Sequence, residues 1–228
     1  MTAENDKNIT GRTGQPTPPN NWFGELSLCN FINSFYQYRD LRNIPGCSKV
    51  LIIGPGKGLD TAVLRWRQYD VTTLDIDDSS KPDLLGDARD LGVIANAAFD
   101  VVIASHVLEH LPVLDLDRAF SEIARVGRFA IIYLPVHGVH TQIRVAPGLP
   151  KLDFSINIDF TNFLRAPSGD TPAYMDGQHY WEIGMRGFRV KDVRKRMSQF
   201  FDVLSDYRNQ DWLPSHNFVL KSRRSAQS

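Results

Sequence analysis

Residues 50–58 read VLIIGPGKG, and this stretch decides how the chain folds. A short apolar run that ends at a glycine is typical of a strand buried on both faces of a parallel sheet. Gly54, Gly56 and Gly58 then allow a sharp turn, because glycine tolerates positive φ and lets the backbone approach a ligand closely. The apolar positions in 59–66 have helical spacing, so a helix N-terminus is expected to point its positive end at the turn.

Short apolar runs alternate with helical patterns along the rest of the chain. Strands are expected at 71–74, 84–85, 99–104, 129–134, 201–204 and 217–220, and helices at 22–41, 114–126 and from 190 onward. In 22–41, Leu26, Phe31 and Phe35 fall near one face, and in 59–66 Trp66 belongs to the apolar face, so both faces are expected to pack inward. This alternation predicts an α/β, Rossmann-like fold with a mostly parallel sheet flanked by helices. Such sheets bind ligands beyond the carboxyl ends of their strands, where the glycine turn lies.

Two acidic residues follow neighbouring strands of the predicted sheet. Asp75 ends the second strand, about 20 residues after the first glycine, which is the place of a ribose-binding acid; the alternative is an exposed loop acid. Asp87 and Ala88 follow the third strand and could contact an adenine ring through a carboxylate and a backbone N–H. Leu59 stands where a dinucleotide fingerprint requires a small residue, which argues against a nicotinamide or flavin cofactor.

The segments 50–58, 74–77, 86–88 and 99–111, taken in this order, resemble the motifs of class I S-adenosylmethionine-dependent methyltransferases. The resemblance covers roughly residues 48–135 and implies S-adenosyl-L-methionine as the cofactor. It also implies a seven-stranded sheet of order 3-2-1-4-5-7-6 with strand 7 antiparallel. The residues expected to line the cofactor are Gly54, Pro55, Gly56, Asp75, Ile76, Asp87, Ala88, Ser105 and His106.

The chain departs from this family at two places. Ile52 stands where many members have an acid, and Val126-Gly127-Arg128 replaces a common Pro-Gly-Gly turn. The segments 81–87 and 179–184 are similar to methyltransferases of bacterial surface-polysaccharide clusters. That looser similarity implies a sugar or lipid-linked glycan as one possible acceptor, and a small molecule is the other.

Transfer to a hydroxyl oxygen calls for a general base near neutral pH, and histidine is the natural choice. The candidate catalytic residues are His137, at the start of a long insertion, and His179 with Glu182, which flank an aromatic pair. His106 and His110 are interpreted first as a pocket wall or a helix cap. His137, His140 and His179 could form a metal site, but their ligand spacing is not diagnostic, so no metal is expected.

Composition sets the remaining expectations. The 228 residues include 26 basic and 26 acidic side chains, so the net charge gives no reason to expect a nucleic-acid partner. Two cysteines, a polar N-terminus and no apolar run that could cross a bilayer indicate a cytoplasmic protein. We expect a disordered tail at 1–20, a single domain over 21–222 and a flexible tail at 223–228. In the insertion 136–178, residues 152–160 alternate like a half-buried strand. We expect the insertion to be a substrate cap, with a plain edge strand as the alternative.

Two other functions remain open from the sequence. The first is an NAD(P)-dependent oxidoreductase on a similar sheet, against which Leu59 argues. The second is a non-catalytic, methyltransferase-like protein that binds the cofactor without using it.

Overall fold

A computed structural model describes residues 27–145, 154–160 and 177–223. Seven strands form the main sheet in the order β3-β2-β1-β4-β5-β9-β8. The strands are β1 (Lys49–Ile53), β2 (Asp70–Asp75), β3 (Leu84–Leu85), β4 (Phe99–Ser105), β5 (Gly127–Pro135), β8 (Phe201–Arg208) and β9 (Ser215–Ser222). β9 is antiparallel to both β5 and β8, whereas the pairs among β1 to β5 are parallel. Because β8 and β9 are the sixth and seventh strands of this sheet, the predicted fold and strand order are confirmed.

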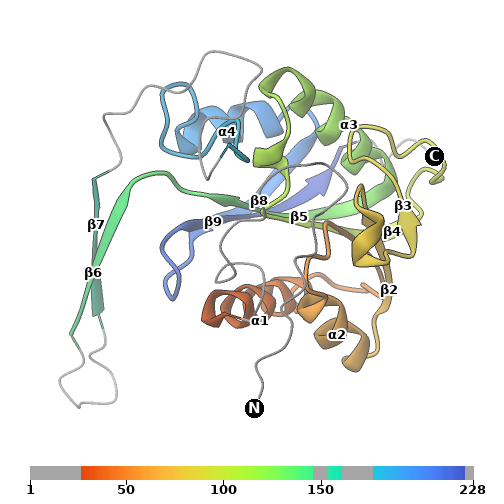
Figure 1. Cartoon of the computed structure of the whole chain (residues 1–228), viewed down its shortest axis with the longest axis horizontal. Coiled ribbons are helices and arrows are strands. Elements are labelled where there is room, and N and C mark those ends of the chain that lie inside the picture. The colour runs from red at the N-terminus through yellow and green to blue at the C-terminus, as the bar shows by residue number, and fades with distance from the viewer. Residues whose placement is uncertain (1–26, 146–153, 161–176, 224–228) are drawn as a thin grey trace, which may run out of the picture.

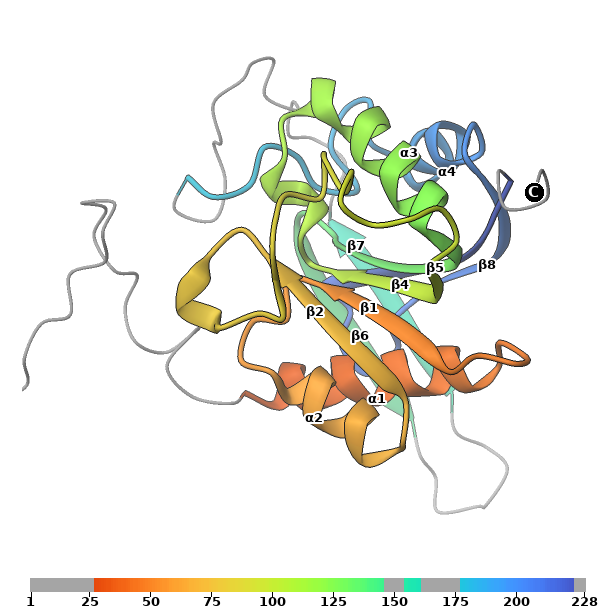
Figure 2. The same ribbon diagram turned by 90° about the vertical axis from the view of Figure 1, so that its right-hand side faces the viewer.

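Helices cover both faces of the main sheet (Figures 1 and 2). α1 (Leu28–Arg42) and α2 (Leu59–Trp66) lie on one face, and α3 (Leu116–Val126) and α4 (Val190–Met197) lie on the other. The central strands β1, β4 and β5 are buried along most of their length, which explains their continuous apolar sequences. Each face of the sheet therefore contributes to its own hydrophobic core.

The inward face of α1 differs from the one that its apolar residues predict. Phe31 and Phe35 are 53% and 59% exposed. The buried positions include the polar residues Ser34, Gln37 and Asp40. Ser34 and Gln37 donate to Asp60, and Asp40 accepts from Tyr133, which offsets much of the cost of burying these side chains. Among the described residues, Oε1 of Gln37 has no hydrogen-bond partner. In α2, likewise, Trp66 is 76% exposed although its spacing suggested the inward face.

The insertion after β5 contains a two-stranded antiparallel sheet, β6 (Val139–Val145) with β7 (Phe154–Phe160). This pair stands apart from the main sheet at the left of Figure 1, on the side where β5 ends. Its base is tied to the body where His140 Nε2 lies 2.9 Å from the carbonyl oxygen of Val136. The strand predicted around 152–160 is thus present, and its role as a substrate cap stays a prediction.

The tail predicted at 1–20 lies outside the described residues, as do 224–228. Within the described ranges, none of the helices combines the length and the apolar character that a membrane span requires.

Candidate functional site

The glycine turn joins β1 to α2 with three residues in the left-handed region. Gly54, Gly56 and Gly58 have φ of 67°, 51° and 76°. A Cβ added to Gly54 would lie 2.5 Å from Cγ2 of Val107, so only glycine fits there. At Gly56 and Gly58 an added Cβ would meet no heavy atom within 4 Å. The turn is therefore packed on one side and open on the other, which fits a ligand seated against its backbone.

The other residues expected to line the cofactor follow the strands beside this turn. Because β3, β2, β1 and β4 are adjacent and parallel, the residues after them meet at one edge of the sheet. The Oδ1 atom of Asp75 accepts a hydrogen bond of 3.0 Å from the N–H of Asp77, and Ile76 is 70% exposed. The structure thus brings all nine expected positions to the carboxyl edge of the sheet.

Asp87 has a partner that sequence reasoning missed. Arg89 donates to its carboxylate from both the backbone N–H (2.8 Å) and the guanidinium (2.6 Å to Oδ2), and also reaches Asp115 at 2.7 Å. The hydrogen bonds from Arg89 lower the pKa of Asp87. Asp87 is therefore an ionised, oriented acceptor, and its remaining lone pairs can receive an amino group.

His106 turns the chain out of β4. Its φ of 56° is in the left-handed region, and its N–H donates to the carbonyl oxygen of Tyr133 at 2.9 Å. The imidazole packs against Trp212 with ring centroids 5.2 Å apart, and Nε2 lies 3.3 Å from Oγ of Ser215. The short helix η2 (Leu108–His110) follows directly, so it begins at the carboxyl edge of the sheet.

The three candidate catalytic residues are in direct contact. Nδ1 of His137 lies 3.0 Å from Oε2 of Glu182, and Nδ1 of His179 lies 2.7 Å from Oε1 of the same carboxylate. A carboxylate only accepts, so both Nδ1 atoms donate and the Nε2 atoms become the basic nitrogens. One buried acid thus orients two imidazoles from different parts of the chain.

The backbone holds this group against η2. The N–H of Tyr180 donates to the carbonyl oxygen of Glu109 at 2.9 Å, and the indole of Trp181 donates to Leu108 at 3.2 Å. The N–H of His137 donates to the carbonyl oxygen of Ile183 at 2.7 Å. The segment 178–183 is therefore fixed between η2 and the start of the insertion.

Glu109 is a further residue that sequence reasoning did not select. Its side chain is fully buried, with Oε1 at 3.6 Å from Nδ1 of His106 and 4.0 Å from Nε2 of His179. Burial acts to raise the pKa of this carboxyl, but His106, and then His110 and His179, outweigh burial and lower it. The only signal in the sequence was the pairing of an acid with two nearby histidines in SHVLEHL at 105–111.

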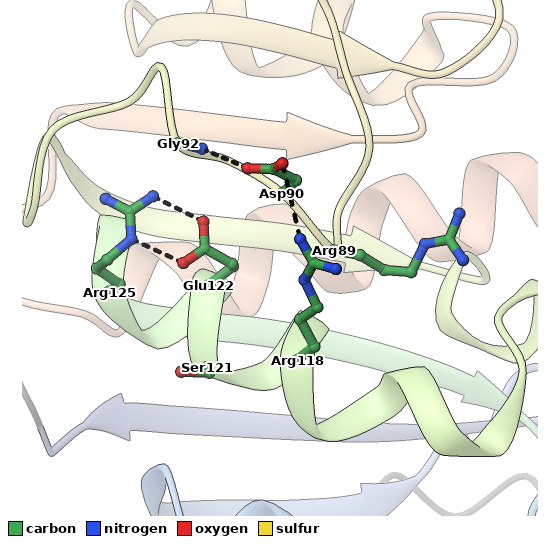
Figure 3. Close-up of a pocket in the computed structure, with 7 residues that line it drawn as sticks. All are labelled: Arg89, Asp90, Gly92, Arg118, Ser121, Glu122 and Arg125. Carbon is green, nitrogen blue, oxygen red and sulfur yellow. Dashed lines mark hydrogen bonds and ion pairs between the residues drawn. The ribbon is translucent and has the colours of Figure 1, made fainter.

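A separate cavity of about 230 Å³ lies between α3 and the loop that follows β3 (Figure 3). Three arginines line it, and each has an acidic partner. Arg125 pairs with Glu122 at 2.7 Å, Arg118 with Asp90 at 3.7 Å, and Arg89 with Asp87. Since these charges are already compensated, the cavity offers no cationic site for an anion, and the carboxyl edge of the sheet remains the candidate site.

The chain is similar in sequence to one family model and in fold to several solved structures. Residues 51–129 match the family model of a methyltransferase domain. No curated protein matches the sequence. Among solved structures, the PH0226 protein from Pyrococcus horikoshii OT3 has a TM-score of 0.57 at 14% identity, covering 88% of this chain and 93% of that one.

Two further solved structures are similar at the same level. The glycopeptide N-methyltransferase MtfA, complexed with S-adenosyl-L-homocysteine, has a TM-score of 0.53 at 13% identity, covering 83% of this chain and 89% of its own. An S-adenosylmethionine-dependent methyltransferase from Clostridium acetobutylicum ATCC 824 has a TM-score of 0.53 at 8% identity, with coverage of 87% and 93%. At such identities the likeness concerns the fold.

Proposed function

We propose that the protein is a class I S-adenosylmethionine-dependent methyltransferase that methylates a hydroxyl oxygen of a small-molecule or glycan acceptor. The match of residues 51–129 to a methyltransferase domain supports the first part of this proposal. The observation that carries this proposal is the pair of imidazoles oriented by Glu182 beside the cofactor edge of the sheet. MtfA, which has the same fold, has been solved with S-adenosyl-L-methionine, S-adenosyl-L-homocysteine and sinefungin, and this supports the choice of cofactor.

The residues at the edge of the sheet fit this cofactor by their chemistry. The open backbone of the turn at Gly56 and the N-terminus of α2 suit the carboxylate of the methionyl group. The carboxylate of Asp75 can accept hydrogen bonds from ribose hydroxyls. The carboxylate of Asp87 can accept a hydrogen bond from the adenine amino group, and the N–H of Ala88 can donate one to a ring nitrogen. The exposed side chain of Ile76 offers an apolar contact.

The bound cofactor supplies an electrophilic methyl group on a sulfonium. The protein's part is to hold the acceptor oxygen in line with that methyl group, which can contribute on the order of 7–11 kcal/mol. We assign the acceptor's side of the site to His137, His179 and Glu182. Glu182 fixes the tautomer of both imidazoles, so the lone pair of each neutral ring lies on Nε2, the atom that would take the proton of the acceptor hydroxyl.

A methyl-transfer screen with labelled S-adenosylmethionine tests this proposal. Hydroxylated small molecules and glycans serve as acceptors, and resistance of the label to alkaline hydrolysis separates a methyl ether from an ester. We expect His137→Gln to lower kcat by about 10²–10⁴-fold, as loss of a general base does, with S-adenosylhomocysteine affinity unchanged. Transfer to nitrogen, or full activity in this variant, would contradict the proposal.

A further inference from the structure

The carboxylate of Glu109 faces its neighbours without a hydrogen bond. Among the residues that the structure describes, neither Oε1 nor Oε2 has a hydrogen-bond partner, and the side chain is 0% exposed. The imidazole nitrogens that face it, from His106 at 3.6 Å and His179 at 4.0 Å, lie beyond hydrogen-bond length. A buried carboxylate in this state is costly unless a cation compensates it.

Two imidazoles beside this carboxylate have their Nδ1 atoms committed elsewhere. His179 donates to Glu182 at 2.7 Å, and His110 donates to the carbonyl oxygen of Gln178 at 3.0 Å. Because these partners only accept, each neutral ring carries its lone pair on Nε2. Histidines that bind metals are oriented in this way, with the other ring nitrogen donating to a carboxylate or a backbone carbonyl.

The donor atoms are spaced for one ion. One ligand atom from each of Glu109, His110 and His179 lies within 4.8 Å of the other two. Bonds of roughly 2.0–2.2 Å at tetrahedral angles place two ligands of one ion roughly 3.3–3.6 Å apart. Glu109 Oε1 and His179 Nε2 are 4.0 Å apart, so the group would have to contract to bind an ion.

We propose that Glu109, His110 and His179 bind one first-row divalent metal ion. Two imidazole nitrogens and one carboxylate oxygen form a donor set that suits Zn²⁺ or Mn²⁺ and leaves coordination positions for other ligands. His110 is exposed whereas Glu109 and His179 are buried, so the ion would be reached from the side of His110. Sequence spacing did not reveal this set, because His179 is far from the other two in the chain.

The place of the ion suggests its role, and this role rests on the proposed function. Val107, two residues before Glu109, packs directly on Gly54 of the cofactor turn. An ion at Glu109 could bind the acceptor hydroxyl and lower its pKa. The proton would pass to Nε2 of His137, the oxygen would bond to the methyl carbon, and the electron pair of the broken C–S bond would remain on sulfur.

Metal titration of the full-length, chelator-treated protein tests the site without measuring activity. Zn²⁺ and Mn²⁺ are titrated by calorimetry, and Co²⁺ is followed by its visible absorption. We expect one ion per chain in the wild type and at least a 100-fold weaker affinity in Glu109→Gln and His179→Ala. Glu182→Gln, which changes the orienting partner of His179 and of His137 but removes no proposed ligand, should weaken metal affinity by about 10–100-fold.

His140→Ala is the matched control, since this histidine lies in the insertion and outside the group; it should bind the ion like the wild type. Circular dichroism of each metal-free variant confirms that it is folded. Absence of stoichiometric binding in the wild type, or equal binding in wild type and His179→Ala, would overturn the inference. If S-adenosylhomocysteine still binds in that case, the proposed function stands and only the metal site fails.

Discussion

Gly54 and Gly56 have different tasks, although both have positive φ. A methyl group at Gly54 would collide with Val107, whereas one at Gly56 would enter open space. We expect Gly54→Ala to lower the free energy of unfolding by about 1–3 kcal/mol, which urea unfolding measures.

Gly56→Ala is the matched variant for this comparison. It should lower the free energy of unfolding only by the backbone strain of about 1–2 kcal/mol. It should also weaken S-adenosylhomocysteine binding, because its Cβ would occupy the space proposed for the ligand. Equal effects of both variants on binding would show that the open side of the turn does not face the cofactor.

The residues of the turn could be predicted because a conformational demand leaves a direct trace in the sequence. Positive φ selects glycine, and a strand end selects the place of Asp75. Glu109 could not be selected in this way. Its role depends on His179, which only the folded chain brings within 4.0 Å, and no local pattern encodes that contact.

At the scale of elements, α1 is attached to the sheet by a buried polar cluster. Asp40 is 5% exposed and accepts from the hydroxyls of Tyr133 at 2.7 Å and Tyr207 at 2.5 Å. Burial, followed by the charge of Asp40, raises the pKa of Tyr133 well above its usual value. Both hydroxyls therefore stay protonated and donate to the acid at neutral pH.

Asp40→Asn should destabilise the protein by about 1–3 kcal/mol, because one carboxylate oxygen is replaced by an amide nitrogen that cannot accept a hydrogen bond. That nitrogen faces either the two tyrosine hydroxyls, which share Oδ2, or the guanidinium of Arg39, which binds Oδ1. Thermal and urea unfolding measure the effect. Arg39→Gln is the control: its ion pair with Asp40 is partly exposed on the arginine side, so it should cost at most about 1 kcal/mol. A larger loss in Arg39→Gln than in Asp40→Asn would contradict this account of how α1 is attached.

This cluster also explains why the sequence predicted the wrong face of α1. Hydrophobic periodicity assumes that a helix buries its apolar residues, and it therefore placed Phe31 and Phe35 inside. The helix instead buries Asp40 and its neighbours, whose partners are supplied by distant strands. In β1, β4 and β5, by contrast, burial on both faces leaves a continuous apolar run, and these strands were predicted correctly.

At the scale of the whole molecule, the sheet gathers its functional groups at one edge. The parallel strands bring the glycine turn, Asp75 and Asp87 together, and the segment after the insertion places His179 and Glu182 beside η2. The parallel arrangement of the strands follows from alternating helices and strands, whereas their order was implied by the resemblance of the motifs to a known family. The docking of 178–183 could not be predicted, because it depends on hydrogen bonds from the Trp181 indole and the Tyr180 N–H to the carbonyl oxygens of Leu108 and Glu109, which have no sequence signature.

Calorimetric titration with S-adenosyl-L-homocysteine tests whether the glycine turn and Asp75 hold this cofactor, with NADH as the competing ligand and Asp75→Ala as the matched variant. We expect one site per chain for S-adenosylhomocysteine, no binding of NADH, and an affinity at least about 10-fold weaker in Asp75→Ala, since two hydrogen bonds to ribose are lost. No binding up to about 1 mM, equivalent to about −4 kcal/mol, or tighter binding of NADH, would contradict it.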